Sequence, residues 1–246
     1  MALRVYLSPH LDDAVFSCGG LIARQTARGD EVVVVTVCAG DPPVGELTAF
    51  AYELHRRWGG EGSPMGLRRA EDLVACGRVG ASVLHLPLPD AIYRRSAHGE
   101  PLYPDGTSLF TPLAPLDSAR IDEAAAALER AVPQESEIYL PLGIGGHVDH
   151  ILTRRAAERL AVPRWYYREL PYALRPAPVA TEAAPEGATE ASVALAEAEI
   201  EIWAAAAGEY TSQLSTFWAD YESLEADLRA FHDRFGGIPL LRAAAS

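Results

Sequence analysis

The sequence predicts a single α/β domain with a Rossmann-like, doubly wound and mostly parallel sheet that carries helices on both faces. Residues 31–38 (EVVVVTVC) form a β-branched run without polar alternation, which is typical of a strand buried on both faces. Strand-like and helix-like segments alternate along most of the chain, which favours parallel strands joined by right-handed crossovers. Because ligands of such sheets bind beyond the carboxyl ends of the strands, the loops that follow the strands are the places to search.

The first half of the chain opens with a strand, a helix and a second strand. A short apolar strand over 4–7 is followed by a helix over 14–28, which ends at Gly29, and by the strand over 31–38. A long connection begins at Gly40. Helices over 47–57 and 64–79 are separated by a turn-rich break, and a third strand covers 82–88. Residues 97–117 contain four prolines and are predicted to form a surface loop.

The second half continues the same alternation and then changes character. It predicts a helix over 117–132, a strand over 137–142, a glycine loop over 143–146, a helix over 148–160 and a strand over 164–169. Residues 171–190 are rich in Pro, Ala, Glu and Thr and are predicted to be a mobile loop. The remainder, 191–246, is predicted to be helical, with helices over 191–208 and 218–234. The chain 1–246 is interpreted as one domain.

Composition excludes several classes of function. The chain has 34 acidic and 21 basic residues, for a net charge of −13, which argues against nucleic-acid and anionic-membrane partners. All 21 basic residues are arginine, so Schiff-base and P-loop lysine chemistry is excluded. Three cysteines without a CxxC pair, no signal-like N-terminus and no apolar stretch of about 20 residues predict a cytoplasmic protein with reduced, buried thiols. Oligomeric state is not specified, and a homo-oligomer remains open.

Two loops at neighbouring predicted strand ends carry the unusual polar residues. Residues 9–13 (PHLDD) follow the first strand, and residues 145–150 (GGHVDH) follow the fourth. Each alone would more often be a helix cap, but together they place three histidines and three aspartates at one edge of the sheet. Two imidazoles and a carboxylate suffice for a catalytic zinc site, a second carboxylate can serve as general base, and a further imidazole can stabilise an oxyanion or protonate an amine.

These motifs resemble the LmbE-like (PIG-L) zinc deacetylases, in which a strand is followed by Pro-His-x-Asp-Asp and a later segment reads His-x-Asp-His. Residues 8–13 and 147–150 carry the resemblance. Weaker similarities are Arg-x-x-Glu at 68–71 with Gly-Ala at 80–81, a strand ending in an acidic residue at 86–90, and Tyr-x-Ser-Gln-Leu at 210–214. The resemblance runs from residue 5 to about 214, nearly the whole chain.

The resemblance implies a role for each matching residue. His10, Asp13 and His150 would be the zinc ligands, and Asp12 would be the general base that activates the zinc-bound water. His147 would stabilise the oxyanion or help protonate the amine. Asp149 would hydrogen-bond an imidazole, with His147 the favoured partner. Arg68 and Asp90 would contact a sugar-like substrate.

The sequence departs from the family pattern at two positions. Leu11 stands where the commonest family form has Pro, and Gly145 stands where some members have Tyr. The stretch 166–172 (YYRELPY) is a candidate source for a replacement tyrosine.

The sequence therefore predicts a zinc-dependent hydrolase that deacetylates an N-acetylated amino sugar or a related small conjugate. Fe²⁺ is the other metal that suits the same ligands, and an Fe(II)-dependent oxygenase is one alternative, although Asp12 has no task in that chemistry. A non-catalytic sugar- or metal-binding module is the other alternative. A dinucleotide loop at 143–146 is disfavoured because the pattern needs glycine at 148, which is Val. The Cys-Gly-Gly at 18–20 is interpreted as close packing of the first helix rather than as a nucleophile.

Overall fold

A central mixed sheet organises the protein. The computed structural model describes residues 1–59, 62–175 and 183–244. Within them lies a seven-stranded sheet of order β3-β2-β1-β4-β5-β7-β6. Its strands are β1 (Leu3–Ser8), β2 (Glu31–Thr36), β3 (Ser82–His85), β4 (Glu137–Pro141), β5 (Arg164–Tyr167), β6 (Thr189–Val193) and β7 (Ile238–Arg242). β1 to β5 are parallel, whereas β7 is antiparallel to both β5 and β6.

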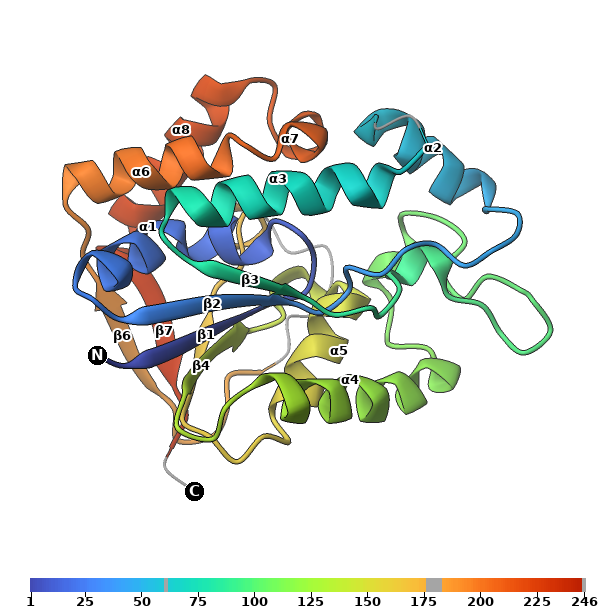
Figure 1. The fold of residues 1–246 in the computed structure, drawn as a ribbon, viewed down its shortest axis with the longest axis horizontal. Helices are drawn as coiled ribbons and strands as arrows, with labels where there is room; N and C mark the ends of the chain where they lie inside the picture. The colour runs from blue at the N-terminus through green and yellow to red at the C-terminus, as the bar shows by residue number, and fades with distance from the viewer. Residues whose placement is uncertain (60–61, 176–182, 245–246) are drawn as a thin grey trace.

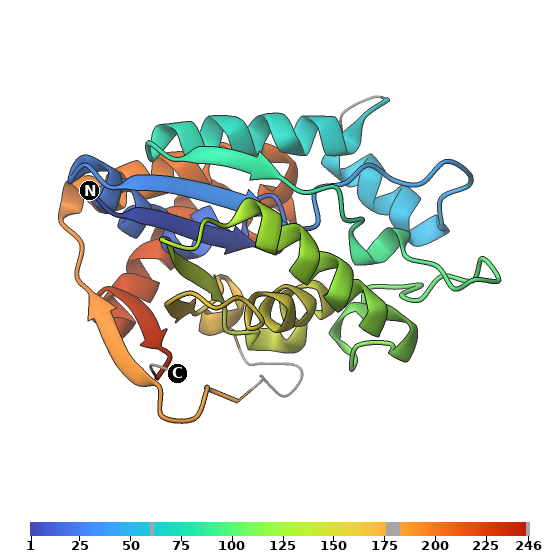
Figure 2. The same ribbon diagram turned by 60° about the horizontal axis from the view of Figure 1, so that its bottom comes forward.

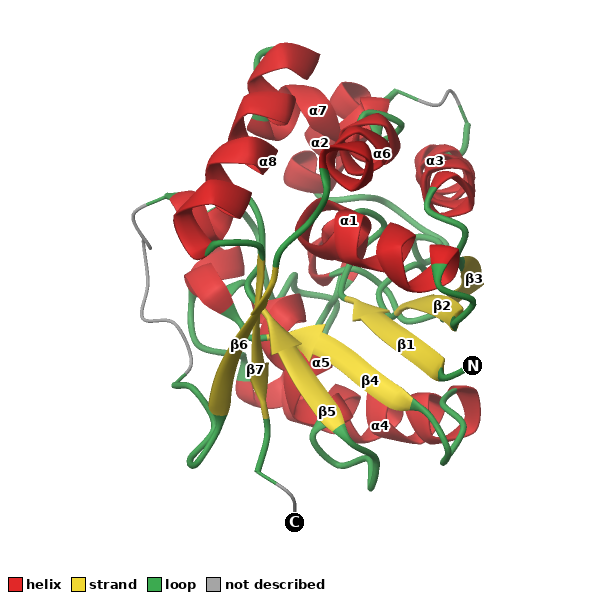
Figure 3. Cartoon of the chain, turned by 90° about the vertical axis from the view of Figure 1, so that its left-hand side faces the viewer, coloured by secondary structure: helices red, strands yellow, loops and turns green. Residues whose placement is uncertain are grey.

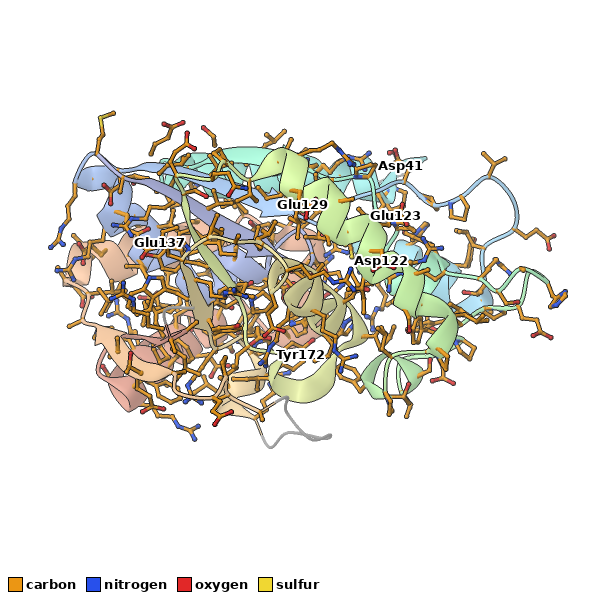
Figure 4. The ribbon with its side chains drawn as sticks, turned by 90° about the horizontal axis from the view of Figure 1, so that it is seen from below. Asp41, Asp122, Glu123, Glu129, Glu137 and Tyr172 are labelled. Atoms are coloured by element: carbon orange, nitrogen blue, oxygen red, sulfur yellow. The ribbon has the colours of Figure 1, made fainter. Side chains whose placement is uncertain are left out.

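Helices cover both faces of this sheet, so the predicted doubly wound α/β fold is confirmed (Figure 1). The helices are α1 (Asp13–Ala27), α2 (Ala49–Trp58), α3 (Pro64–Arg78), α4 (Ser118–Ala131), α5 (Val148–Ala157), α6 (Glu197–Ala207), α7 (Thr211–Phe217) and α8 (Tyr221–Phe235). Figure 3 shows α1, α3, α6 and α8 on one side of the strands and α4 and α5 on the other. The exposed side of α4 carries Asp122, Glu123 and Glu129, which places part of the acidic charge in solvent (Figure 4).

Burial on both faces explains the apolar character of β2. Val32 and Val34 pack in the cluster under α1 and α6, while Val35 and the following Val37 pack in the cluster under α4 and α5. Successive side chains of a strand point to opposite faces, so a strand covered on both sides needs apolar residues at every position. This is the physical reason why the run without alternation predicted its place in the sheet.

The topology creates a crevice beside β1. From β1 the chain winds outward through β2 and β3 on one side, whereas β4 and β5 lie on the other side. The loops after β1 and β4 therefore diverge at the carboxyl end of the sheet, where ligands of such folds bind. Figures 1 and 2 show α2 and the segment before α4 extending beyond this end.

The predicted surface loop over 97–117 is in part buried. Tyr103 and Leu109 belong to a third apolar cluster with Leu11 and Trp58, beside the carboxyl end of the sheet. The Tyr103 hydroxyl donates a hydrogen bond to Asp117 Oδ2 at 3.0 Å. Proline content predicted the lack of long helices or strands, but it did not reveal that this segment is anchored to the core.

The C-terminal part differs most from the prediction. β6 and β7 were not predicted, and β3 ends at His85, three residues early. β6 (TEASV) lies at the sheet edge and is largely exposed, so it has no apolar face to identify it. β7 contains Pro239, which has no backbone N–H to donate. Pro239 is paired with Ser192 of the edge strand β6 but lies outside the residues that pair with β5, so the missing N–H costs little. Of the predicted mobile loop over 171–190, residues 176–182 lie outside the described part of the chain.

Two further observations bear on the sequence predictions. All three cysteines are free and buried, as expected. In residues 1–59, 62–175 and 183–244, each helix is too short or too polar to cross a bilayer.

The close packing expected at residues 18–20 is present, although the partner is a helix rather than a strand. A Cβ on Gly19 would lie 2.5 Å from Trp203 Cδ1, whereas a Cβ on Gly77 in α3 would meet nothing within 4 Å. We expect Gly19→Ala to destabilise the fold by about 1–3 kcal/mol through overpacking. Gly77→Ala is the matched control and should stabilise it by up to about 1 kcal/mol. Urea unfolding of both variants measures this, and equal stabilities would contradict the packing argument.

Candidate metal centre and pocket

The loop after β1 presents two adjacent carboxylates that are not used as helix caps. Ser8 Oγ accepts a hydrogen bond from Ala14 N at 3.0 Å and donates one to the His10 carbonyl at 2.6 Å, so Ser8 secures the start of α1. Asp12 occupies the N-cap position without a capping hydrogen bond from its side chain. Its Oδ2 instead accepts from Arg68 at 3.3 Å. The Asp12 side chain is therefore not a helix cap.

The loop after β4 brings a second polar group to the same edge. Positive φ angles at Gly143, Gly145 and Gly146 allow a sharp turn that side chains would disfavour. His147 caps α5, because its Nδ1 accepts a hydrogen bond from Asp149 N at 3.2 Å. In neutral His147 the proton is therefore on Nε2, which leaves an N–H donor on the other side of the ring.

Asp13 joins the two loops. Its Oδ2 lies 3.2 Å from His10 Nδ1, and its Oδ1 lies 3.3 Å from His150 Nε2. The ring centroids of His10 and His150 are 5.5 Å apart, and His147 lies within 5.3 Å of both rings. The four side chains are buried. The structure thus gathers the three predicted ligand residues and His147 in one cluster.

This donor set suits a divalent cation. His150 Nε2 is buried without a hydrogen-bond partner, although it faces Asp13 Oδ1. Asp13 approaches each histidine with a different carboxylate oxygen, at 3.2 Å from His10 Nδ1 and 3.3 Å from His150 Nε2, so one carboxylate faces the nitrogens of both rings. Groups of side chains able to hold a metal ion include His10 with His147 and His150, and His10 with Asp12 and Asp13.

Each of the two histidines has a buried carboxylate behind it. His10 Nε2 donates to Asp149 Oδ2 at 3.0 Å, and His150 Nδ1 lies 3.2 Å from Glu169 Oε1. The imidazole that the Asp149 carboxylate hydrogen-bonds is that of His10 and not the favoured His147, whose Nδ1 accepts a hydrogen bond from the backbone N of residue 149. Such carboxylates fix the tautomer and orientation of an imidazole, so that the other ring nitrogen can bind a metal.

Glu169 was not identified from the sequence. It lies two residues beyond β5, and its Oε1 also accepts from Gly143 N at 2.6 Å and Ile144 N at 3.1 Å. It therefore supports both His150 and the glycine loop. An acidic residue just past the carboxyl end of a parallel strand is the signal that could have identified it.

Burial and charge set the protonation of the cluster. Burial, together with the neighbouring charge of Asp13, raises the pKa of Asp12 to about 7, against the opposing effects of Arg68 and His10. Burial lowers the pKa of His147 well below its usual range, and the charge of His10 adds to this. Burial also acts against the charge of Asp149, but Arg94 and the hydrogen bond from His10 outweigh it and lower the pKa of that carboxyl.

The Arg68 side chain points toward the site and does not turn back toward Glu71 on the same helix. It is 3% exposed and stacks on Trp58 with 4.5 Å from the guanidinium carbon to the ring centroid. Arg68 Nε is buried without a hydrogen-bond partner. Glu71 instead accepts from Ser212 N at 2.9 Å and Ser212 Oγ at 2.6 Å, which anchors α7 against α3. Arg68 and Glu71, one turn apart on α3, therefore contact different partners.

A pocket opens above the cluster. The two motif loops contribute His10, Asp12, Asp13 and His147 to its walls. Six further segments contribute Leu54, Trp58, Arg68, Asp90, Ile92, Leu109, Tyr172, Gln213 and Phe217. Asp90 lies 3.9 Å from His10 Nε2 and caps the short helix Ala91–Tyr93. Both predicted substrate contacts, Arg68 and Asp90, therefore line the pocket.

Tyr172 fills the space that a side chain at position 145 would occupy. A Cβ on Gly145 would lie 3.0 Å from Tyr172 Cδ1. The Tyr172 ring is 5.6 Å from that of His150, beside α5 (Figure 4). The stretch 166–172 thus places one tyrosine in the pocket wall, whereas Tyr167 is buried under β1 and donates to the Leu7 carbonyl at 2.8 Å.

Comparisons with known proteins identify a family and several relatives. The model of the family described as PIG-L, GlcNAc-PI de-N-acetylase, matches residues 5–161, a span that includes both motif loops. A curated relative from Streptomyces fradiae, named 2'-N-acetylparomamine deacetylase, is 33% identical over 176 residues, covering 68% of this chain and 56% of the relative. A relative of the same name from Niallia circulans is 28% identical over 190 residues, covering 68% and 66%.

The match thus spans less than two thirds of the length of either curated relative. Among solved structures, a deacetylase in the biosynthesis pathway of teicoplanin is 27% identical, with a TM-score of 0.79 and 100% of both chains covered. Glu169 and Tyr172 lie outside the family match, so their place in the site comes from the tertiary structure alone.

Proposed function

Since the chain belongs to the PIG-L family of GlcNAc-PI de-N-acetylases, we propose that it is a zinc-dependent hydrolase that removes an acetyl group from an N-acetylated amino sugar or a related small conjugate. The observation that carries this proposal is the position of Asp13 between His10 and His150, with Asp12 beside them at the base of a pocket. A site for binding alone would need no second carboxylate there.

His10, Asp13 and His150 would hold the ion, and His10 Nδ1 and His150 Nε2 are the nitrogens that face Asp13. When bound, zinc would lower the pKa of a coordinated water and polarise the acyl carbonyl. Metal binding requires neutral imidazoles, so protons held in the cluster would leave as the ion enters. Fe²⁺ is the alternative occupant of the same ligands.

The remaining residues would perform the proton transfers. Asp12 would accept a proton from the attacking water, with Arg68 holding the carboxylate in place at 3.3 Å. His147, which keeps its proton on Nε2, would donate a hydrogen bond to the oxyanion formed when the oxygen of water adds to the acyl carbon. As the C–N bond breaks, Asp12 would return its proton to the amine, and acetate and the free amino sugar would leave. Arg68 Nε and Asp90 would contact the polar groups of the sugar.

The names of the relatives support acetylated amino sugars as the substrate class, because two of them are called 2'-N-acetylparomamine deacetylases. Apolar and aromatic side chains, such as Trp58, Tyr172 and Phe217, supply flat surfaces suited to the faces of sugar rings. The three free, buried cysteines support a reducing compartment such as the cytoplasm.

The proposal is tested by measuring acetate release from a panel of N-acetylated amino sugars with added zinc and with chelator. We expect release that the chelator abolishes and that zinc restores. Release that persists in metal-free protein would contradict the metal mechanism. Metal binding without release from any N-acyl sugar would favour a binding module, and oxygen consumption with a cosubstrate would favour an oxygenase.

A further inference from the structure

Arg94 is a buried arginine directly behind the side chains of the proposed metal site. Its side chain is fully buried, as are the side chains of Asp149 and Asp117, with which it forms ion pairs. Arg94 Nη1 donates to Asp117 Oδ2 at 2.7 Å, and Nε and Nη2 both donate to the Pro89 carbonyl at 3.1 Å. A charge in such a place is costly unless it is paired, so this arrangement needs an explanation.

The two oxygens of Asp149 connect Arg94 to His10. Arg94 Nη2 pairs with Oδ1, while Oδ2 accepts hydrogen bonds from His10 Nε2 and Ala91 N, each at 3.0 Å. With Oδ1 held by the guanidinium, the plane of the carboxylate is fixed and Oδ2 faces the imidazole. The hydrogen bond at Nε2 then aims Nδ1 of His10 at Asp13.

The same arginine secures the wall of the pocket. Asp117 ends the segment that begins at Asp90, and this segment supplies three pocket residues, Asp90, Ile92 and Leu109. Through Asp117 and Pro89, Arg94 ties both ends of the segment to the carboxylate behind His10. One guanidinium therefore links the orientation of a ligand to the shape of the pocket.

We propose that Arg94 is a positioning residue, which acts through Asp149 to orient His10 for metal binding. This inference rests on the proposed metal site. Lysine at this position would keep the charge but lose the planar fork, so it could not hold Asp149, Asp117 and the Pro89 carbonyl at once. Loss of a partner behind a ligand typically weakens metal affinity by about 10–100-fold.

The test is the zinc Kd of purified Arg94→Lys protein, measured by competition with a chromophoric chelator. We expect a Kd about 10–100-fold above that of the wild type. Asp117→Asn is the matched control, since it removes the other carboxylate partner of Arg94. We expect it to lower the melting temperature while the zinc Kd stays within about threefold, because Asp149 and His10 keep their contacts.

Asp149→Asn gives a second, independent variant. It should weaken zinc binding to a similar degree, and the double variant should be little worse than either single variant, because the two residues act in series. A wild-type Kd in folded Arg94→Lys, or in Asp149→Asn, would overturn the role of Arg94 and leave the metal site standing. Wild-type protein that binds no zinc would instead overturn the proposed function itself.

Discussion

Replacing Asp12 with asparagine is expected to lower kcat by at least about a hundredfold while the protein keeps its bound metal. Asparagine has nearly the same shape and can still accept a hydrogen bond from Arg68, but it cannot take a proton from water. Asp12 contacts Arg68 and is not one of the proposed ligands, so zinc binding should survive. The loss in kcat should therefore exceed any change in KM.

The measurement is acetate release at saturating substrate, with metal content determined on the same samples. The matched control is Asp41→Asn. It breaks the exposed ion pair between Asp41 Oδ1 and Arg69 Nη2, which are 2.7 Å apart, and Arg69 directly follows Arg68 in α3. That variant should stay within about twofold of the wild type, because an exposed ion pair contributes little. Wild-type kcat in Asp12→Asn would remove Asp12 as the general base.

Replacing Asp13 with alanine is expected to abolish metal binding and, with it, turnover. The two oxygens of Asp13 face one nitrogen each of His10 and His150, so its removal takes away the carboxylate ligand and the charge that faces both rings. A three-residue ligand set reduced to two imidazoles should bind zinc at least about a hundredfold more weakly, beyond the range seen for loss of an outer partner.

Zinc content after dialysis and a chelator-competition Kd provide the readout, and far-UV circular dichroism confirms that the variant is folded. Asp90→Asn serves as the control, because Asp90 is also a buried carboxylate of the pocket, yet it lies 3.9 Å from His10 Nε2, the nitrogen that does not face Asp13. This variant should retain the metal, and its effect should be on substrate binding. Stoichiometric zinc at wild-type affinity in Asp13→Ala would rule out the proposed ligand set.

Much of the fold could be predicted because its signals are local. The two-faced burial of β2 favours apolar residues at its central positions, 32–35, and glycines such as Gly29 mark where helices end. β6 and β7 could not be predicted in this way. β7 pairs with β5 on one side and with β6 on the other, which are contacts between segments far apart in the chain, and neither β6 nor β7 has the residue pattern of an isolated strand.

The site shows the same division. The two short motifs at 9–13 and 145–150 were recognisable because adjacent parallel strands, β1 and β4, bring the loops that follow them together. Glu169 and Arg94 belong to no recognisable motif. Each is a single charged residue whose role depends on its partner in the folded chain, His150 for Glu169 and Asp149 for Arg94. Only the folded chain shows that both are buried and paired.

Local patterns in the sequence predicted the parallel α/β framework, the edge at which the polar residues meet, and the carboxylates and imidazoles of the two motif loops. Their pairing became evident only in the folded chain: Asp149 with His10, Glu169 with His150, and Tyr172 over Gly145. The physical reason is that secondary structure follows from periodic, local patterns of burial. Which of the three imidazoles a carboxylate hydrogen-bonds depends instead on small differences in distance and angle, and tertiary packing fixes these.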